Sequence, residues 1–560
     1  PEVQFVCFSS QGFFHRILTK KWLVEIRGYQ ECVRGNMAAV DLSFCQGDDD
    51  SVRTDRTVLI VGKLSHLNSL AWSDVRDTLQ TLVDKETWKT ALKSLKPNPT
   101  DKCPLWLNLV TVAALPSKVS RHNTPSSAHA LTQLIQTCIP GKRDGHILVV
   151  CEKTSVFASA CAIARAFPLF SRISGHNSLD KVYRVTAEFV CVEPNKEPLS
   201  TATLMCLNRV AESIRLTARI VDSPCSEMDT EQFLKEVRAV GLELGITPII
   251  FKGEELRKRG FGGIYAVGSA AASPPALAVL SHTPPSATQT IAWVGKGIVY
   301  DTGGLMIKGK TVMPGMKRDC AGAAAVLGAF SAAVRQGFKE NLHAIFCLAE
   351  NSVGPKATRP DDILRLYSGK TVEVRNTDAE GRLLLADGVV YASRDLKADI
   401  ILDMATLTGA QGIATGKYHA GLLTNREEWE RACMAAGRSS GDLIQPLVFS
   451  PELHFSEFSS AMADMKNFDR SNAPCSCGGL FVGAQLGFDW SGVWIHVDMA
   501  FPAYSGERAT GYGVALLLAL FGQATDDALL QLVSPLRPEI DGPSGGSQSP
   551  RSNPKRRKLI

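Results

Sequence analysis

Residues 291–308 read Ile-Ala-Trp-Val-Gly-Lys-Gly-Ile-Val-Tyr-Asp-Thr-Gly-Gly-Leu-Met-Ile-Lys, and they join an apolar strand to a loop that carries charges. The run from Ile291 to Val294 is typical of a fully buried strand. It is expected to deliver Lys296 and Asp301 into a turn, where paired glycines let the backbone approach a ligand or a metal. In α/β sheets, ligands bind beyond the carboxyl ends of strands, so this stretch predicts such a sheet.

Three further apolar stretches in the C-terminal half are expected to be strands, at 342–348, 399–404 and 493–497. Each of them runs into a loop of polar or small residues. Polar side chains that follow these strands are therefore expected to gather at one edge of the sheet. The candidates for supporting a site from these positions, although such residues are more often structural, are Glu350, Asn351, Asp403 and Asp498.

The N-terminal half contains a smaller set of alternating strands and helices. Apolar runs at 57–62, 146–151 and 185–192 are typical of buried strands, and the Ala-rich run at 155–167 is typical of a helix. Such alternation indicates a second α/β layer. A helical pattern at 204–221 leads into a Ser-Pro pair and is expected to connect the two halves.

The predicted fold is an α/β protein with two domains. The smaller N-terminal α/β domain is joined to a larger C-terminal catalytic α/β domain, which has a central mixed sheet flanked by helices. The expected divisions in chain order are a disordered or upstream extension at 1–36, the N-terminal domain at 37–199, a linker helix at 200–222, the C-terminal domain at 223–540 and a disordered basic tail at 541–560.

Composition narrows the class of protein. The 560 residues are 45% hydrophobic and 21% charged, which is ordinary for a globular domain. The net charge is only +5, so no nucleic-acid partner is expected, and no apolar run is long enough to predict a membrane partner. The 15 scattered cysteines favour a reducing, cytoplasmic location. The run Pro554-Lys-Arg-Arg-Lys558 resembles a nuclear import signal, and a solvated basic tail is the equally weighted alternative.

A second charged cluster reads Asn-Thr-Asp-Ala-Glu-Gly-Arg at 376–382. Apolar residues on both sides are expected to anchor this loop in the core, where the charges of Asp378 and Glu380 require cations. Asp319 precedes an Ala-rich helix expected at 321–336, and taken alone an aspartate at that position is more often an N-cap.

Charge counting connects the two clusters. Together they hold four carboxylates, those of Asp301, Asp319, Asp378 and Glu380. Two divalent ions would balance these charges, and zinc, manganese or magnesium would suit the oxygen ligands. Lys296 could join such a site only as a neutral amine, with its pKa lowered by burial and by the metals. Lys308 would stay charged and polarise a scissile carbonyl.

These clusters resemble the leucine aminopeptidase family of metallopeptidases. The family's signature heptapeptide is present at 376–382, and the spacing that leads from Lys296 to Asp319 fits the family pattern. The loop at 406–409 resembles the family's substrate-binding loop. The resemblance covers the C-terminal half well and the N-terminal half loosely, and within the family the chain is most similar to a vertebrate aminopeptidase-like branch.

The resemblance implies a metal-dependent aminopeptidase that hydrolyses N-terminal residues from short peptides through a water activated by two metals. Asp301 and Glu380 would bridge both ions. Asp378 would bind one ion, and Lys296 and Asp319 would bind the other.

Further roles are implied for the residues around the ions. Lys308 would hold the substrate carbonyl and the tetrahedral intermediate, and Arg382 would hold a bicarbonate ion that acts as general base. The residues implied to border the pocket for the first substrate residue are Met316, Thr406 and Gly409. The family also implies a homo-hexamer with active sites that face an interior cavity.

Some positions depart from the family pattern and keep alternatives open. Met306 stands where a small serine is usual, Thr302 replaces another serine, and Cys320-Ala321 replaces a Met-Gly pair. These changes motivate one alternative, a catalytically weak or inactive binding or scaffold protein on an aminopeptidase fold. A two-metal phosphoesterase or nuclease is the other alternative. A zincin is set aside because the sequence holds no H-E-x-x-H motif.

Overall fold

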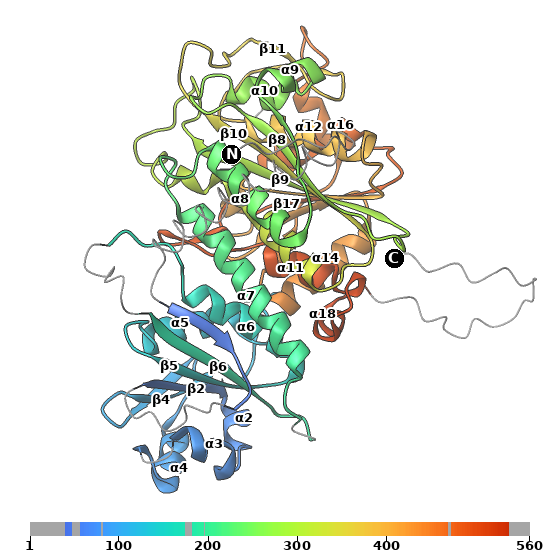
Figure 1. The fold of residues 1–560 in the computed structure, drawn as a ribbon. Helices are drawn as coiled ribbons and strands as arrows, with labels where there is room; N and C mark the ends of the chain where they lie inside the picture. The colour runs from blue at the N-terminus through green and yellow to red at the C-terminus, as the bar shows by residue number, and fades with distance from the viewer. Residues whose placement is uncertain are drawn as a thin grey trace, which may run out of the picture.

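The structure is a computed structural model. It describes residues 40–47, 56–79, 82–173, 182–194, 197–468 and 472–536. The smaller N-terminal α/β domain lies at the bottom of Figure 1, and the larger C-terminal α/β domain lies above it, as predicted. The expected extension at 1–36 and the expected tail at 541–560 lie outside the described residues.

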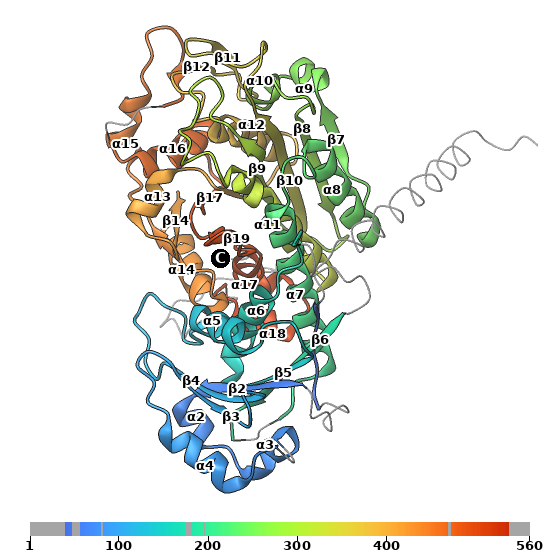
Figure 2. The ribbon, with the colours of Figure 1, turned by 90° about the vertical axis from the view of Figure 1, so that its left-hand side faces the viewer.

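The N-terminal domain is built on a six-stranded sheet in the order β1-β6-β5-β2-β4-β3, in which only β3 is antiparallel to its neighbour. Helices α5 and α6 cover the face towards the larger domain, and α2, α3 and α4 cover the other (Figure 2). The strands are β1 Val40–Phe44, β2 Thr57–Lys63, β3 Asp101–Leu105, β4 Val110–Leu115, β5 Gly145–Cys151 and β6 Tyr183–Cys191. The helices are α2 Leu64–Asn68, α3 Trp72–Leu79, α4 Lys85–Ser94, α5 Ala128–Cys138 and α6 Val156–Ala166.

Helix α7 connects the two domains, where the sequence predicted a helix. It spans Thr201–Asp222 and begins at Ser200, whose hydroxyl accepts a hydrogen bond of 3.1 Å from the backbone N–H of Thr203. Its buried residues join the same hydrophobic core as α6 and α11, so both domains share this helix as a common support.

The larger domain is built on a mixed eight-stranded sheet in the order β15-β14-β17-β13-β9-β10-β8-β7. Helices α8, α11, α14 and α17 pack on one face with α7, and α9, α10, α12 and α16 pack on the other. The strands of the sheet are β7 Ile249–Lys252, β8 Ala276–His282, β9 Thr290–Asp301, β10 Asn341–Asn351, β13 Ile400–Ala405, β14 Ala420–Thr424, β15 Ile444–Pro446 and β17 Val493–Asp498. The helices are α8 Thr230–Leu244, α9 Glu254–Arg259, α10 Gly262–Gly268, α11 Ala321–Arg335, α12 Gly381–Arg394, α13 Gly409–Ala414, α14 Glu427–Ser440, α15 Pro451–His454, α16 Pro474–Leu486, α17 Val514–Leu520 and α18 Ala528–Val533.

Two small sheets lie outside this central sheet. One contains β11 Ile363–Arg365, β12 Thr371–Glu373 and β16 Met465–Lys466, and the other pairs β18 Tyr504–Ser505 with β19 Arg508–Ala509. Strands β11 and β12 follow β10 in the chain and lead directly to the charged loop before α12, whereas β16 comes from a later segment and pairs with β12.

Strand β9 corrects one prediction. The sequence suggested that the strand stops at Val294, but β9 continues to Asp301 and holds Lys296 within it. A glycine is required at position 295, because α11 packs closely against the strand there. A Cβ atom at Gly295 would lie only 2.4 Å from the Cα atom of Ala323 in α11. Gly295 therefore makes room for a helix. The turn begins only at Gly303, whose φ is +84°.

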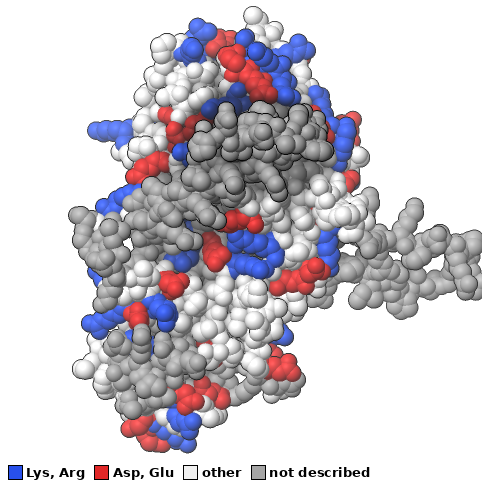
Figure 3. All heavy atoms as spheres, in the orientation of Figure 1, with Lys and Arg blue, Asp and Glu red and all other residues white. Residues whose placement is uncertain are grey.

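The surface carries charges of both signs. On the face shown in Figure 3, lysine and arginine side chains are interspersed with aspartate and glutamate. Within the ranges that the structure describes, no helix combines the length and the hydropathy needed to cross a membrane.

Candidate metal centre

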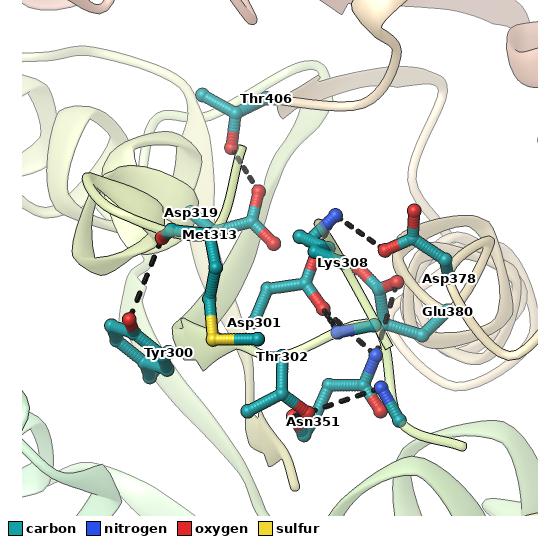
Figure 4. A network of polar contacts seen from close by, with 12 residues as sticks. Tyr300, Asp301, Thr302, Lys308, Met313, Asp319, Asn351, Asp378, Glu380 and Thr406 are labelled. Atoms are coloured by element: carbon teal, nitrogen blue, oxygen red, sulfur yellow. Dashed lines mark hydrogen bonds and ion pairs between the residues drawn. The ribbon is translucent and has the colours of Figure 1, made fainter. Parts of the chain in front are cut away.

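The charged residues singled out in the sequence come together at the carboxyl edge of the central sheet (Figure 4). Strand β9 carries Lys296 in its interior and Asp301 at its end. Asp319 lies in a 3-10 turn, η3 (Met316–Cys320), which leads into α11. Asp378 and Glu380 come from the loop that enters α12. Three chain segments thus supply one site.

Lys296 forms the buried base of the site, with 2% of its surface exposed. Its Nζ atom lies 2.8 Å from Asp319 Oδ2 and 2.9 Å from Glu380 Oε1, and it donates to the carbonyl of Thr406 at 3.0 Å. Burial disfavours the charge on the amine, as expected, but the carboxylates of Asp319, Glu380 and Asp301 outweigh burial and raise the pKa of Lys296 above its ordinary value.

Lys308 approaches the same carboxylates from the loop after β9. Its Nζ atom lies 2.8 Å from Asp301 Oδ2 and donates to Asp378 Oδ1. Partial burial again opposes the charge, and Asp301, Glu380 and Asp378 again raise the pKa of the amine. Lys308 is therefore a cation held at the mouth of the acidic cluster.

The acids outnumber these two lysines. Asp301, Asp378 and Glu380 each place a carboxylate oxygen within 4.8 Å of the others. Burial, followed by the charge of Asp301, raises the pKa of Glu380 and of Asp378. Asp301 and Glu380 are buried and the Asp378 side chain is 29% exposed. Such crowding of largely buried carboxylates is costly unless cations are shared among them, so the donor set fits divalent metal ions.

Asp319 is held by side chains and not by a helix terminus. Its Oδ1 atom accepts hydrogen bonds from Lys296 Nζ at 2.8 Å and from Thr406 Oγ1 at 2.7 Å. The N-cap of α11 is Cys320, and no side chain caps that helix. The N-cap alternative for Asp319 is therefore wrong, because the acid turns into the cluster instead.

Asn351 confirms the expectation that a strand-end residue supports the cluster. Its Nδ2 atom donates to Asp301 Oδ1 at 2.8 Å and to the carbonyl of Thr377 at 3.1 Å, so it joins the end of β9 to the loop before α12. Glu350 lies beside it in the chain but accepts a hydrogen bond from Ser352 Oγ at 2.7 Å. Of these two candidates, only Asn351 contacts the cluster.

Asp498 anchors the Thr406–Gly409 loop. Its Oδ1 atom accepts from the backbone N–H of Leu407 at 3.1 Å, and its Oδ2 atom accepts from Thr408 Oγ1 at 2.6 Å. Asp403, by contrast, binds His496 and Trp494 inside the core.

The expected pocket residues lie around this loop. Met316 begins the 3-10 turn that carries Asp319, Thr406 contacts Asp319, and the backbone at Gly409 is exposed with open space around it.

Arg382 is buried in the first turn of α12, and it makes no ion pair with the four acids of the cluster. Its Nη1 atom donates to the carbonyl of Asn467 at 2.9 Å, whereas its Nε atom is buried without a hydrogen-bond partner among the described residues. Burial lowers the pKa of Arg382 to about 10. The guanidinium thus keeps donor capacity that protein groups do not use.

Asn467 is a residue of the site that sequence reasoning missed. It is fully buried, its Oδ1 atom accepts from the backbone N–H of Arg375 at 2.8 Å, and its Nδ2 atom donates to the carbonyl of Asn376 at 2.7 Å. It therefore fixes the start of the heptapeptide loop. A single asparagine in an irregular segment gives no signal in one sequence, and only the tertiary fold brings it here.

Two family models match the chain. "Cytosol aminopeptidase family, catalytic domain" matches residues 215–518, and "M17 aminopeptidase N-terminal domain 2" matches residues 56–176. The mouse protein "Probable aminopeptidase NPEPL1" is 63% identical over 526 residues, which covers 94% of this chain and 100% of the relative. "Leucine aminopeptidase 1" of Caenorhabditis elegans is 42% identical and covers 85% of this chain and 96% of the relative.

Solved structures of aminopeptidases are also similar to this chain. The structure of Caenorhabditis elegans leucine aminopeptidase superposes with a TM-score of 0.82 at 40% identity, over 88% of this chain and 100% of that one. Leucyl aminopeptidase from Trypanosoma brucei, in complex with bestatin, gives a TM-score of 0.80 at 35% identity, over 90% of this chain and 99% of that one.

Proposed function

Because the chain belongs to the cytosol aminopeptidase family of metal-dependent peptidases, we propose that it removes N-terminal residues from short peptides with two divalent ions. The observation that carries the proposal is the buried surplus of carboxylates over lysines at the edge of the central sheet. Two ions would match the four acids of the cluster.

The ligands proposed for the two ions come from the family resemblance, and the contacts of these residues support them. Asp301, Asp378 and Glu380 would hold the ions through their clustered carboxylates, and Asp301 and Asp378 also contact Lys308. Lys296 and Asp319 would help to hold one of the two ions, and Lys296 would do so only as a neutral amine, after its proton has been lost to make way for the metal. Zinc is the proposed metal, with manganese and magnesium as further candidates for these oxygen and nitrogen donors.

When bound, the ions would supply an activated water as nucleophile and a Lewis acid for the peptide carbonyl. Lys308 would hold the carbonyl oxygen and stabilise the negative charge that develops on it, because its amine is charged and is fixed by Asp301 and Asp378. Arg382 would hold a bicarbonate ion as general base, a role that suits its buried and unused donor.

The pocket for the first substrate residue is proposed to be bordered by Met316, Thr406 and Gly409. Met306 is 44% exposed on the loop that carries Lys308, and its backbone N–H donates to Thr377 Oγ1 at 2.9 Å. Its side chain is therefore partly exposed to solvent on the loop that carries Lys308. We propose that it narrows the path by which the substrate approaches the metal centre. Ala321 is buried at the start of α11 and is not exposed to a substrate.

The family match and the complete set of acids do not favour a scaffold protein without activity. They also argue against a phosphoesterase or nuclease, since the matching family consists of peptidases. Neither alternative gains support from Met306, which removes no ligand.

The test is a hydrolysis panel of amino-acid amides and dipeptides with chelated protein that is resupplied with zinc, manganese or magnesium. Metal-dependent release of the N-terminal residue is expected, and Asp378→Ala should abolish it. If the parent protein hydrolyses nothing with any of the three metals, the proposal fails. Phosphate-ester hydrolysis faster than amide hydrolysis would revive the phosphoesterase alternative.

Assembly and location extend the proposal. A homo-hexamer is proposed from the family resemblance, and light scattering of the full chain would measure its mass.

A cytoplasmic location is proposed because none of the 13 cysteines in the described part of the chain is in a disulfide bond. Import into the nucleus through the basic tail stays a prediction that imaging of tail-deleted protein would test.

A further inference from the structure

A groove of about 740 Å³ opens at the far end of the larger domain from the N-terminal domain. It lies between α9, α10, β11 and the loop that precedes β11, which stand together at the top of Figures 1 and 2. None of its lining residues belongs to the metal centre. Its volume falls within the range of small-molecule sites, about 300–1,000 Å³.

The lining of this groove is strongly cationic. A single carboxylate, that of Asp362, stands among five basic side chains, which are Arg257, Arg259, Lys356, Arg359 and Arg365. Two neighbouring acids, Glu254 and Glu255, pair with the arginines of α9 from outside the groove. When these acids are counted, the five basic side chains still exceed the three carboxylates by two. Among the described residues, the one further acid that an electrostatic contact links to them is Asp464, on which Arg365 acts from a distance.

The cations retain donors for a ligand. Arg257 and Arg259 use their Nε atoms for Glu254 and Glu255, at 2.8 Å and 2.9 Å, which leaves their terminal Nη atoms unused by these pairs. Lys356 and Arg365 form no ion pair with any described residue. Arg359 pairs with Asp362. A ligand that contacts Lys356, Arg365 and the Nη atoms of the two α9 arginines would therefore meet available donors and need not break existing ion pairs.

The backbone that carries these side chains is fixed on α10. A Cβ atom at Gly262 would lie 2.0 Å from the carbonyl oxygen of Arg365, so β11 packs directly against the start of the helix. Thr358 Oγ1 donates to the carbonyl of Ala266 at 2.8 Å, and Ser269 Oγ donates to the carbonyl of Lys356 at 2.6 Å. The loop and the strand are thus held in place before any ligand arrives.

We propose that this groove binds a compact, phosphate-bearing small anion, independently of the peptidase site. Guanidinium groups present pairs of donors that match phosphate oxygens, and a compact anion with several charges can contact several of the five cations at once. An extended acidic peptide spreads its charges along a chain and uses a gathered cluster less well.

The test is calorimetric titration of inorganic pyrophosphate into the full chain. Chelator-treated and then dialysed protein keeps metal ions at the peptidase site from binding the probe. One saturable event per chain is expected. The double variant Lys356→Glu/Arg365→Glu should weaken it at least tenfold, and the milder Lys356→Gln/Arg365→Gln should weaken it less.

The matched control is Lys93→Glu/Lys96→Glu, which makes the same charge change at exposed positions of the N-terminal domain. It should leave the affinity within twofold of the parent. An absence of saturable binding, or an equal loss in both charge-reversal variants, would overturn the proposal. Tighter binding of hexaglutamate than of pyrophosphate would also overturn it, in favour of an acidic peptide. Peptide hydrolysis is measured separately, so failure here does not touch the proposed function.

Discussion

The two sheets of this molecule treat charges at their strand ends in opposite ways. In the N-terminal sheet, β2 ends at Lys63, whose Nζ atom lies 2.9 Å from Oε1 of Glu152, the residue that follows β5. Their side chains are 21% and 37% exposed. In the C-terminal sheet, the Nζ atom of Lys296, which reaches the carboxyl edge from the interior of β9, is similarly 2.9 Å from Oε1 of Glu380, but these two side chains are only 3% and 4% exposed.

This difference shows which property turns the edge of a sheet into a candidate metal site. Lys63 and Glu152 balance each other, and solvent screens what remains, so such a pair contributes little to stability. The buried cluster holds more acids than lysines, and this surplus is tolerable only with further cations. The shared α/β architecture therefore does not predict chemistry, whereas the unmatched buried charge does.

The largest expected effect breaks the buried cluster at its centre. Asp301→Asn removes the carboxylate that contacts Lys308 and accepts from Asn351. Hydrolysis of leucine amide, measured as kcat/KM at saturating metal, should fall by at least about 100-fold, the scale lost when one preorganised electrostatic group is removed. Glu152→Gln is the control at the other sheet and should retain the parent rate. A value for Asp301→Asn close to the parent would contradict the account.

Bound metal should stabilise the folded protein through the buried cluster of the C-terminal sheet and not through the charged pair of the N-terminal sheet. Resupplying zinc or manganese to chelated protein at a free concentration of 100 times Kd should stabilise the fold by about 2.7 kcal/mol for each ion bound. Scanning calorimetry would record this as a rise in Tm. The rise should vanish in Asp301→Asn and persist in Glu152→Gln. A rise of equal size in all three proteins would place the bound ion outside the cluster.

A support of the cluster should have a smaller effect than a ligand. Thr406→Val removes the hydroxyl that donates to Asp319 at 2.7 Å. Metal affinity should fall by about 10-fold, the lower end of the range for groups that orient ligands. Competition with a fluorescent chelator would measure it. Thr137→Val on α5, whose hydroxyl donates only within its own helix, is the matched control and should leave the affinity unchanged.

The N-terminal domain keeps a half-buried titratable group, His129 on α5, neutral. Burial, followed by the charge of Arg165, lowers the pKa of His129 to about 4. Because the unfolded imidazole titrates near 6.5, this group's contribution is fully present above that pH and is lost as pH falls towards 4, by at most about 1.4 kcal/mol per pH unit. When the pH is lowered from 7 to 5, the Tm of His129→Phe should therefore fall less than the Tm of the parent protein. Equal losses in calorimetry would exclude this role.

The smallest effect is expected at the matched pair itself. Glu152→Gln should change the free energy of unfolding by less than about 1 kcal/mol, because the pair is partly exposed and screened. Urea titration would measure the change. A loss of several kcal/mol would show that strand-end charges in the N-terminal sheet are also critical, and the contrast between the sheets would disappear.

The sequence predicted most of the architecture, because long apolar runs determine where strands are buried. Strands β2, β5 and β6 lie within two residues of their predicted bounds, and α7 lies where a connecting helix was expected. The error at β9 arose because Gly295 and Gly297 interrupt the apolar pattern. Only the tertiary neighbours explain why glycines stand inside a strand: α11 packs against Gly295, and Leu348 of β10 packs against Gly297.

The acids of the centre were predictable because the heptapeptide at 376–382 and the spacing around Asp301 are local patterns. Asp319 was ambiguous, since an aspartate before a helix is ordinarily a cap, and only its contacts with Lys296 and Thr406 decide otherwise. Asn467 was not predictable, because its partner Arg382 is 85 positions away and no local pattern marks the contact.

The central claim is that divalent ions balance the buried surplus of acids. The most direct test is elemental analysis of the folded chain after equilibrium dialysis against saturating zinc or manganese, with Asp301→Asn in parallel. The account predicts two ions per parent chain and a loss of ions from the variant. A folded parent chain that holds no divalent ion at saturating supply would contradict it.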